Sequence, residues 1–302
     1  MTRMTFIGVS TGSSSIMTLF PLWAEELGLE GATLAGEDLP LGARPDQYRT
    51  SVEALRDDPD RAGALVTTHK MSLYAAAHDL FDELDDFARA CGEISSIAKR
   101  DGRLLGHAKD PLTARLALEE FFPADGFGAA RDAVVLGAGG AGTALTWCLA
   151  ERDDRPRRIV VTDTSEERLA HLREVHDQRG TPADLLDLRL ASPDATRRAL
   201  AEAPAGSLVV NASGLGKDRP GSPLPDDAVL PEGAFAWEFN YRGSLEFLHQ
   251  ARAQEAARGL TVVDGWRYFI HGWTQVIAEV YDIPMPADRV SRLARIAEEA
   301  RR

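Results

Sequence analysis

A glycine-rich stretch stands between an apolar run and a segment of helical composition. Residues 134–142 read V-V-L-G-A-G-G-A-G, and residues 141–150 are rich in Ala, Leu and Trp. This order predicts a strand, a tight loop and a helix whose first N–H groups face a bound anion. In a dinucleotide-binding loop Gly137 turns the chain, Gly139 admits a pyrophosphate and Gly142 lets helix and strand pack closely. A purely structural glycine turn is the alternative. The candidate coenzyme contacts here are Gly137, Gly139, Gly140, Ala141 and Gly142.

An acidic residue, Asp163, ends the apolar run of residues 159–161 that follows the predicted helix. A carboxylate at this place can accept hydrogen bonds from both ribose hydroxyls of NAD and repels the extra phosphate of NADP. It lies further from the glycines than the usual ~20 residues, and the charged insert 151–158 absorbs the difference. We therefore predict NAD as the coenzyme, with NADP less favoured.

Lysine is rare in this chain, and Lys70 follows a predicted strand end at Thr67. The four lysines, at positions 70, 99, 109 and 217, stand against thirty arginines. An arginine cannot release its proton in a protein, whereas a lysine can act as a base once burial or nearby charge lowers its pKa. Lys70 is therefore a candidate base, with a solvated surface charge as the alternative.

Two loops carry further polar groups that could contact a substrate. Residues 10–15 are hydroxyl-rich and suit a substrate hydroxyl or carboxylate, with helix capping by Ser15 as the alternative. Asp110 ends the segment 106–110 and precedes Pro111. From there it could cap a helix, contact a substrate, or do both.

Strands alternate with helices along the chain, which is typical of α/β layers with a largely parallel sheet. The pair Asp101-Gly102 favours a tight hairpin turn, and a Pro/Gly/Ala-rich passage at 123–130 marks a domain boundary. We predict strands at 5–9, 33–36, 64–67, 94–98, 104–107, 134–136, 158–162, 185–189, 208–211, 235–239 and 260–263. The predicted helices lie at 16–27, 45–57, 111–122, 141–150 and 268–281, and others begin at 70 and 287.

Composition excludes several classes of protein. The chain has 302 residues, 44% of them hydrophobic, and a net charge of −13, which argues against a nucleic-acid or anionic-membrane partner. Two cysteines imply no disulfide framework, and no segment approaches ~18 uninterrupted apolar residues. We expect a cytoplasmic protein with a small-molecule partner and no metal site. The oligomeric state stays open, with a homodimer as one option.

The order of these motifs resembles the shikimate/quinate dehydrogenase family over nearly the whole chain. The matching features are the serine loop, His69-Lys70, the pattern Gly106-x-x-x-Asp110 and the sequence GAGGAG. Residues 211–213 and Asp264-Gly265 add to the likeness. The resemblance implies a substrate-binding α/β domain over 1–122, a Rossmann-type NAD(P)-binding domain over 123–265, and C-terminal helices over 266–302 that pack back on the first domain.

By this resemblance Lys70 and Asp110 correspond to the family's catalytic Lys–Asp pair. Lys70 would take the proton from a substrate hydroxyl while hydride leaves the same carbon, and Asp110 would hydrogen-bond both substrate and lysine. The implied substrate contacts are Ser13, Ser14, Ser15, Thr67, Ser95, Tyr241 and His271. The implied coenzyme contacts beyond the glycine loop are Asp163, Thr164, Arg168, Asn211, Ala212, Ser213 and Gly265.

Several substrate-contact positions depart from the family pattern. Aligned without gaps, its serine clamp starts at Ser14 but meets Ile16 at the second place, whereas a shift of one residue, which requires a deletion, puts Ser13 and Ser15 there. Its substrate-binding glutamine falls on Gly272. Its two asparagines fall on Ser95 and Ala108. Its Asn-Arg-Thr turn, typical of NADP members, is Asp163-Thr164-Ser165, with Arg168 one turn into the next helix.

Buried hydrogen-bonding groups without partners cost about 1–3 kcal/mol each, so these replacements should weaken shikimate binding severely. Our hypothesis is an NAD-dependent dehydrogenase for a related cyclic polyol or hydroxy acid. The alternatives are shikimate or quinate dehydrogenase proper and a non-catalytic ligand sensor with the same fold. New donors to the substrate could come from Lys109, Arg242, Arg267 and His271.

Overall fold

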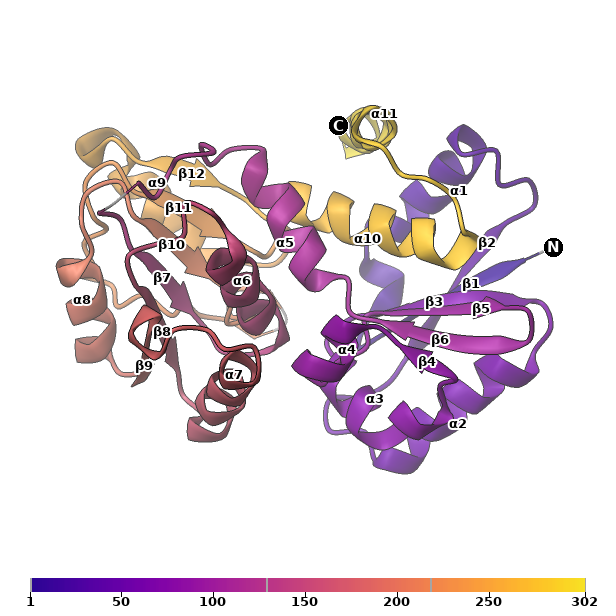
Figure 1. Ribbon diagram of the computed structural model, residues 1–302. Coiled ribbons are helices and arrows are strands. Elements are labelled where there is room, and N and C mark those ends of the chain that lie inside the picture. The colour runs from indigo at the N-terminus through magenta and orange to yellow at the C-terminus, as the bar shows by residue number, and fades with distance from the viewer. Residues whose placement is uncertain (1, 129, 218, 302) are drawn as a thin grey trace. The chain divides into compact units, whose positions relative to one another are not determined.

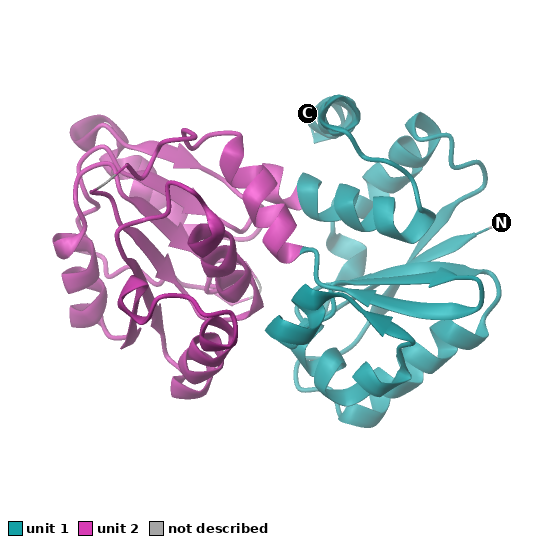
Figure 2. Ribbon diagram, in the orientation of Figure 1, with its two compact units in different colours: residues 1–109, 270–302 teal, residues 110–269 magenta. Residues whose placement is uncertain are grey.

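The chain folds into two compact units in a computed structural model that describes residues 2–128, 130–217 and 219–301. Unit 1 takes residues 1–109 and 270–302, and unit 2 takes residues 110–269 (Figure 1, Figure 2). Within the described residues each unit contains one sheet of six strands. The chain therefore leaves unit 1 at Lys109 and returns to it inside helix α10 (Trp266–Tyr281).

The sheet of unit 1 is mixed. Strand β1 pairs in parallel with β2 and β3, whereas β5 is antiparallel to both β3 and β6. The β5–β6 turn carries Asp101 and Gly102 at φ +51° and +76°, which confirms the predicted tight hairpin. The strands in spatial order are β2 (Thr33–Asp38), β1 (Arg3–Gly8), β3 (Arg61–Val66), β5 (Ser96–Arg100), β6 (Arg103–His107) and β4 (Glu83–Leu84).

The C-terminal helix α11 (Ala287–Arg301) packs against α1 (Ile16–Glu26) of the same unit. Trp23 Nε1 donates to the Leu293 carbonyl over 2.9 Å, and Arg292 pairs with Glu26 at 2.9 Å. The predicted return of the C-terminal helices to the first domain is thus confirmed. The remaining helices of unit 1 are η1 (Thr11–Ser13), α2 (Pro45–Asp57), α3 (Lys70–Ala77), η2 (His78–Leu80) and α4 (Asp86–Cys91).

The sheet of unit 2 is parallel throughout, and its order is that of a Rossmann fold. Counted from β7, the strands lie in the order 3-2-1-4-5-6, with the reversal between β7 and β10. Both faces of β7 are buried, so its residues are apolar without alternation. The strands are β7 (Ala133–Leu136), β8 (Ile159–Asp163), β9 (Leu186–Leu190), β10 (Leu208–Asn211), β11 (Phe235–Glu238) and β12 (Thr261–Val263).

Helix α5 (Asp110–Glu119) groups with unit 2, so the unit boundary falls before it rather than in the passage 123–130. The reason is packing: Ala114, Ala117 and Leu118 share a buried core with β7 and with helix α6 (Gly140–Glu151). The other helices of unit 2 are α7 (Glu166–Gln178), η3 (Ala183–Leu185), α8 (Pro193–Glu202) and α9 (Glu246–Arg258).

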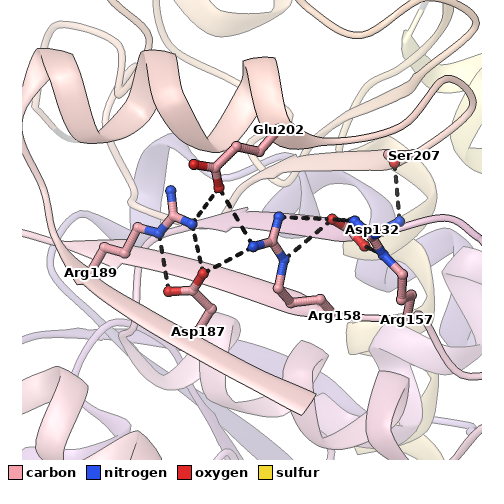
Figure 3. Close-up of polar contacts among 7 residues, drawn as sticks. All are labelled: Asp132, Arg157, Arg158, Asp187, Arg189, Glu202 and Ser207. Carbon is pink, nitrogen blue, oxygen red and sulfur yellow. Dashed lines mark hydrogen bonds and ion pairs between the residues drawn. The ribbon is translucent and has the colours of Figure 1, made fainter. Parts of the chain in front are cut away.

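A network of ion pairs ties the strands of unit 2 together (Figure 3). Asp132 lies just before β7 and is fully buried. Its carboxylate accepts two hydrogen bonds from the Arg157 guanidinium, both at 2.9 Å, and one from Arg158 at 3.1 Å. Arg158 also reaches Asp187 on β9, which pairs with Arg189. Three acids and three arginines alternate when Glu202 is included, so the charges balance.

Candidate active site

The glycine-rich loop has the geometry that its sequence predicts. Gly137 has φ +120°, and a Cβ there would lie 2.7 Å from the backbone of Ala212. A Cβ on Gly142 would lie 2.0 Å from the Gly137 carbonyl oxygen, so helix and loop approach too closely for any side chain. A Cβ on Gly139, by contrast, would meet nothing within 4 Å. Gly139 is the N-cap of α6, and the open space beside it fits an anionic group against the first N–H groups of that helix.

Asp163 holds this loop in place, a role that its sequence position did not reveal. Its Oδ2 accepts from the Ala138 N–H over 2.7 Å, and its Oδ1 accepts from the Ser165 N–H over 2.9 Å. The side chain is nearly buried, and Arg168 lies 3.9 Å away. Each carboxylate oxygen can accept a second hydrogen bond, so ribose binding stays compatible with these contacts.

A cavity of about 430 Å³ in unit 2 brings several of the predicted coenzyme residues together. Gly137, Asp163, Thr164, Arg168 and Ser213 all line it. Ser192, Thr196 and Arg219 also line it, and only the folded chain brings these three to the same place. The cavity lies at the carboxyl ends of β7, β8 and β10, where ligands of parallel sheets bind. A larger cavity of about 640 Å³ in unit 1 is lined by residues of β1, β2 and α2, and none of the predicted site residues lines it.

A buried polar network stands behind the turn after β10. Asn211, fully buried, donates to Glu238 over 2.8 Å and accepts from Ser213 Oγ over 2.7 Å. Glu238 accepts twice more from Asn240, at 2.8 Å from its N–H and 2.7 Å from its side chain. Burial raises the pKa of Glu238 to about 7, although these donors act in the opposite direction. Glu238 thus holds the predicted coenzyme residue Asn211 in place, and the sequence motifs did not indicate this role.

Gly265 and Tyr241 lie beside this network. A Cβ on Gly265 would meet the Phe239 carbonyl oxygen at 2.2 Å, so only glycine allows α10 to start against the end of β11. The ring of Tyr241 packs on Phe269, with 4.3 Å between ring centroids, and on Trp266 at 5.8 Å. Tyr241 thus sits on the first turn of α10.

In unit 1 the predicted base, Lys70, is the first residue of α3 and is half-buried. Its carbonyl accepts from the Ile94 N–H over 3.2 Å, which places it beside Ser95. Ser95, itself buried, accepts from the Lys109 N–H over 2.7 Å. The structure therefore brings Lys70, Ser95 and the residue before Asp110 together. Thr67 follows the last residue of β3, and its N–H donates to the Ile7 carbonyl.

The hydroxyl-rich loop is ordered by an acid from the neighbouring strand. Asp38 accepts from the Thr11 side chain at 2.6 Å and from its N–H at 2.8 Å, and these hydrogen bonds lower the pKa of Asp38. Ser13 is exposed and donates to Ser10, whereas Ser14 is buried. Ser15 occupies the N-cap of α1 without a side-chain capping bond, so helix capping does not account for it.

Two of the proposed new donors are held by carboxylates. Lys109 Nζ pairs with Glu279 at 2.6 Å, and Arg267 forms an ion pair with Glu120. Glu279 also pairs with Arg100 at 2.8 Å. Burial raises the pKa of Glu279, but the hydrogen bond from Lys109 and the neighbouring positive charges outweigh it and hold that pKa below its usual value. His271, a predicted substrate contact on α10, is buried in unit 1.

Within the described residues there is no cluster of His, Cys, Asp and Glu that could hold a metal ion. The helices described are also too short or too polar to cross a membrane. The predicted site residues include hydroxyls, an amide, a lysine, a histidine, an arginine and carboxylates, which are groups for proton transfer and hydrogen bonding.

No protein-family model matches the chain. Shikimate dehydrogenase (NADP(+)) of Symbiobacterium thermophilum is 33% identical over 232 residues, which cover 75% of this chain and 72% of the relative. Shikimate 5-dehydrogenase of Thermus thermophilus, solved with NADP(H) and shikimate, aligns with a TM-score of 0.72 and 26% identity, over 98% of this chain and 100% of that one. Quinate dehydrogenase of Corynebacterium glutamicum, solved with NAD, has the same fold, with a TM-score of 0.71 and 20% identity over 99% of both chains.

These likenesses, with the Rossmann unit and its glycine loop, define an NAD(P)-dependent oxidoreductase that acts on a CH–OH group. Within that class the chain belongs to the shikimate/quinate dehydrogenase family.

Proposed function

We propose that this protein is a cytoplasmic, NAD-dependent dehydrogenase that oxidises a cyclic polyol or hydroxy acid related to shikimate or quinate. One observation carries the proposal. By the resemblance, Lys70 and Asp110 stand at the positions of the family's reacting pair, whereas Ser95, Ala108 and Gly272 stand where the family has amide side chains that contact shikimate. We therefore propose that the reaction chemistry is kept and that the substrate contacts differ.

In the proposed reaction the Lys70 amine takes the proton of the substrate hydroxyl while hydride leaves the same carbon. The bound coenzyme supplies the hydride acceptor. Asp110 hydrogen-bonds both the substrate hydroxyl and the lysine, and so holds the reacting groups in line. In the reverse direction Lys70 returns its proton to the carbonyl oxygen. A positioned acid–base group of this kind contributes ~10²–10⁴-fold to the rate.

Two hydrogen bonds within unit 1 support the proposed role of Lys70. Ile94 bonds the backbone of Lys70, the next residue Ser95 accepts from Lys109, and Asp110 follows Lys109 directly. Lys109, the last residue of unit 1 before Asp110, thus lies close to the start of α3. Ser14, buried in the loop after β1, and His271 on α10 are the proposed substrate contacts of this unit.

NAD is the proposed coenzyme because an acid, Asp163, lines the cavity of unit 2. Its charge opposes a 2′-phosphate, and the turn has Thr164 where an arginine would favour NADP. Arg168 and Arg219 line the same cavity and partly offset this repulsion. We therefore propose a preference for NAD rather than exclusion of NADP.

A panel assay tests the function. NAD and NADP are each incubated with shikimate, quinate, other cyclic polyols and simple hydroxy acids, and absorbance of the reduced coenzyme is followed at 340 nm. We expect turnover with NAD and a substrate other than shikimate. Lys70→Arg keeps the charge but removes the base, so it should lose at least ~10²-fold in kcat. Lys99→Arg, on β5 of the same unit, is the matched control and should retain activity.

The outcomes separate the alternatives. Efficient shikimate turnover with NADP would identify shikimate dehydrogenase proper and reject the proposed substrate. Absence of turnover, together with a panel compound that raises the melting temperature, would favour the ligand-sensing alternative. If Lys70→Arg and the unsubstituted enzyme turn over substrate at equal rates, Lys70 is not the base of the reaction.

A further inference from the structure

The histidine before the proposed base is fixed at both ring nitrogens. His69 is 3% exposed, its Nε2 lies 2.9 Å from the Leu39 carbonyl oxygen, and its Nδ1 lies 3.0 Å from the Tyr48 hydroxyl. A carbonyl oxygen only accepts, so Nε2 carries a proton and donates to Leu39. A neutral ring then accepts from the Tyr48 O–H at Nδ1, and all three groups are satisfied in one tautomer.

The three residues of this contact come from separate parts of unit 1. Leu39 follows β2, Tyr48 lies in α2 and is buried, and His69 is the N-cap residue of α3. The rings of Tyr48 and His69 also touch, with 5.5 Å between their centroids. The imidazole therefore joins α2 and the end of β2 to the start of α3.

The backbone around His69 requires such support. Thr68 has φ +40°, a left-handed conformation that a β-branched residue rarely adopts. Strained residues of this kind persist only where the surrounding structure holds them. The His69 carbonyl then accepts from the Leu73 N–H over 2.8 Å, which closes the first turn of α3. Lys70 is the first residue of that helix, so the anchored histidine sets where the helix begins.

We infer that the Tyr48–His69 pair is the positioning device of Lys70. The ring anchored on Leu39 and Tyr48 holds the strained turn at Thr68 and the first turn of α3, and thereby directs the Lys70 amine. The inference rests on the proposed function, in which Lys70 transfers the proton. His69 itself acts through the backbone and through Tyr48, and transfers no proton in this scheme.

The low lysine content permits a direct test that needs no substrate. Methylation of the amines with ¹³C-formaldehyde labels only four lysines, at positions 70, 99, 109 and 217, and the N-terminus. Lys70→Arg assigns the Lys70 signal by its disappearance. In Tyr48→Phe and His69→Phe we expect the pH midpoint of that signal to move by about half a unit or more, because the amine changes its surroundings. The signals of Lys99 and Lys109 should stay in place.

Two controls keep the test decisive. Tyr74→Phe removes a hydroxyl from the same helix, α3, where its ring stacks on His78, and it should leave the Lys70 signal unmoved. His69→Gln keeps an amide donor for Leu39 and should give an intermediate shift. If His69→Phe fails to fold, Tyr48→Phe still decides, because it removes a single oxygen atom.

An unmoved Lys70 signal in folded Tyr48→Phe would overturn the inference. With a substrate in hand, the same variant should lower kcat about tenfold and leave coenzyme affinity unchanged, since misplacement of one reacting group affects the chemical step. The two proposals fail separately. If no compound of the panel is turned over, the proposed function is rejected and the NMR result still stands. If the enzyme is active but the Lys70 signal of Tyr48→Phe does not move, only the positioning role is rejected.

Discussion

The carboxylate of Asp163 accepts a hydrogen bond from the Ala138 N–H over 2.7 Å, which ties the end of β8 to the glycine-rich loop after β7. The residue proposed to choose between NAD and NADP therefore also supports the loop that we propose binds the pyrophosphate. We therefore expect a substitution at Asp163 to change coenzyme preference and loop geometry together.

Asp163→Asn should change both properties. The amide has one acceptor oxygen and no charge, so one of the two backbone donors loses its partner while the repulsion of a 2′-phosphate disappears. We expect NAD affinity to fall about tenfold and NADP affinity to rise, since tenfold corresponds to about 1.4 kcal/mol. Calorimetric titration with both coenzymes measures this. An unchanged ratio of the two affinities would contradict the role of Asp163.

Glycine-to-alanine substitutions should separate packing from binding. Gly142→Ala drives a methyl into the Gly137 carbonyl, so the free energy of unfolding should fall by at least about 2 kcal/mol. Gly139→Ala meets no neighbouring atom and should leave stability within about 0.5 kcal/mol. It should nevertheless weaken NAD binding, because the methyl occupies the proposed phosphate space. Urea unfolding measures the stability of both variants, and titration with NAD measures their coenzyme affinity. If folded Gly139→Ala binds NAD with full affinity, the phosphate does not occupy the space beside Gly139.

Stability should depend on pH through Glu238. Burial raises its pKa in the folded chain to about 7, above the ordinary 4.5, so the folded state binds the extra proton between these values. The contribution of the protonated Glu238 to the free energy of unfolding is on the order of 3 kcal/mol. It is fully present below pH 4.5 and is lost as the pH rises through 7. Compared with Glu238→Gln, the unsubstituted protein should lose stability from about pH 5 to about pH 8. Glu255→Gln, an exposed site on α9, is the control, and parallel pH profiles for Glu238→Gln and the unsubstituted protein would refute the prediction.

The buried carboxylate of Asp132 should matter far more than exposed acids of the same unit (Figure 3). Asp132→Asn leaves Arg157 and Arg158 without a full partner, and we expect a loss of about 3 kcal/mol because a buried pair is broken on one side. Asp194→Asn removes an exposed pair with Arg197 and should cost nothing measurable. Comparable urea midpoints for the two variants would show that the network does not stabilise the sheet.

Much of the architecture followed from local chemistry. The helices at Pro45–Asp57 and from Lys70 begin where the sequence predicts, because Pro at the first helical position and a strand end before Lys70 mark their starts. The short strand β4 and helix α4 were missed. Two residues of β4 carry no periodic pattern, although Asp85 as N-cap and Gly92 in a left-handed conformation mark the ends of α4 in the sequence.

The amino-acid sequence by itself determined the glycine-rich loop, most of the order of strands and helices and the family resemblance, because glycine spacing and apolar runs act over a few neighbouring residues. Only the tertiary structure decided that Asp163 supports Ala138, that Glu238 joins Asn211 to Asn240, and that Tyr48 and Leu39 hold His69. Most of these partners lie more than twenty residues apart in the chain. A buried hydrogen bond is stronger than an exposed one because the protein interior has a low dielectric constant, and which residues are buried depends on the whole fold.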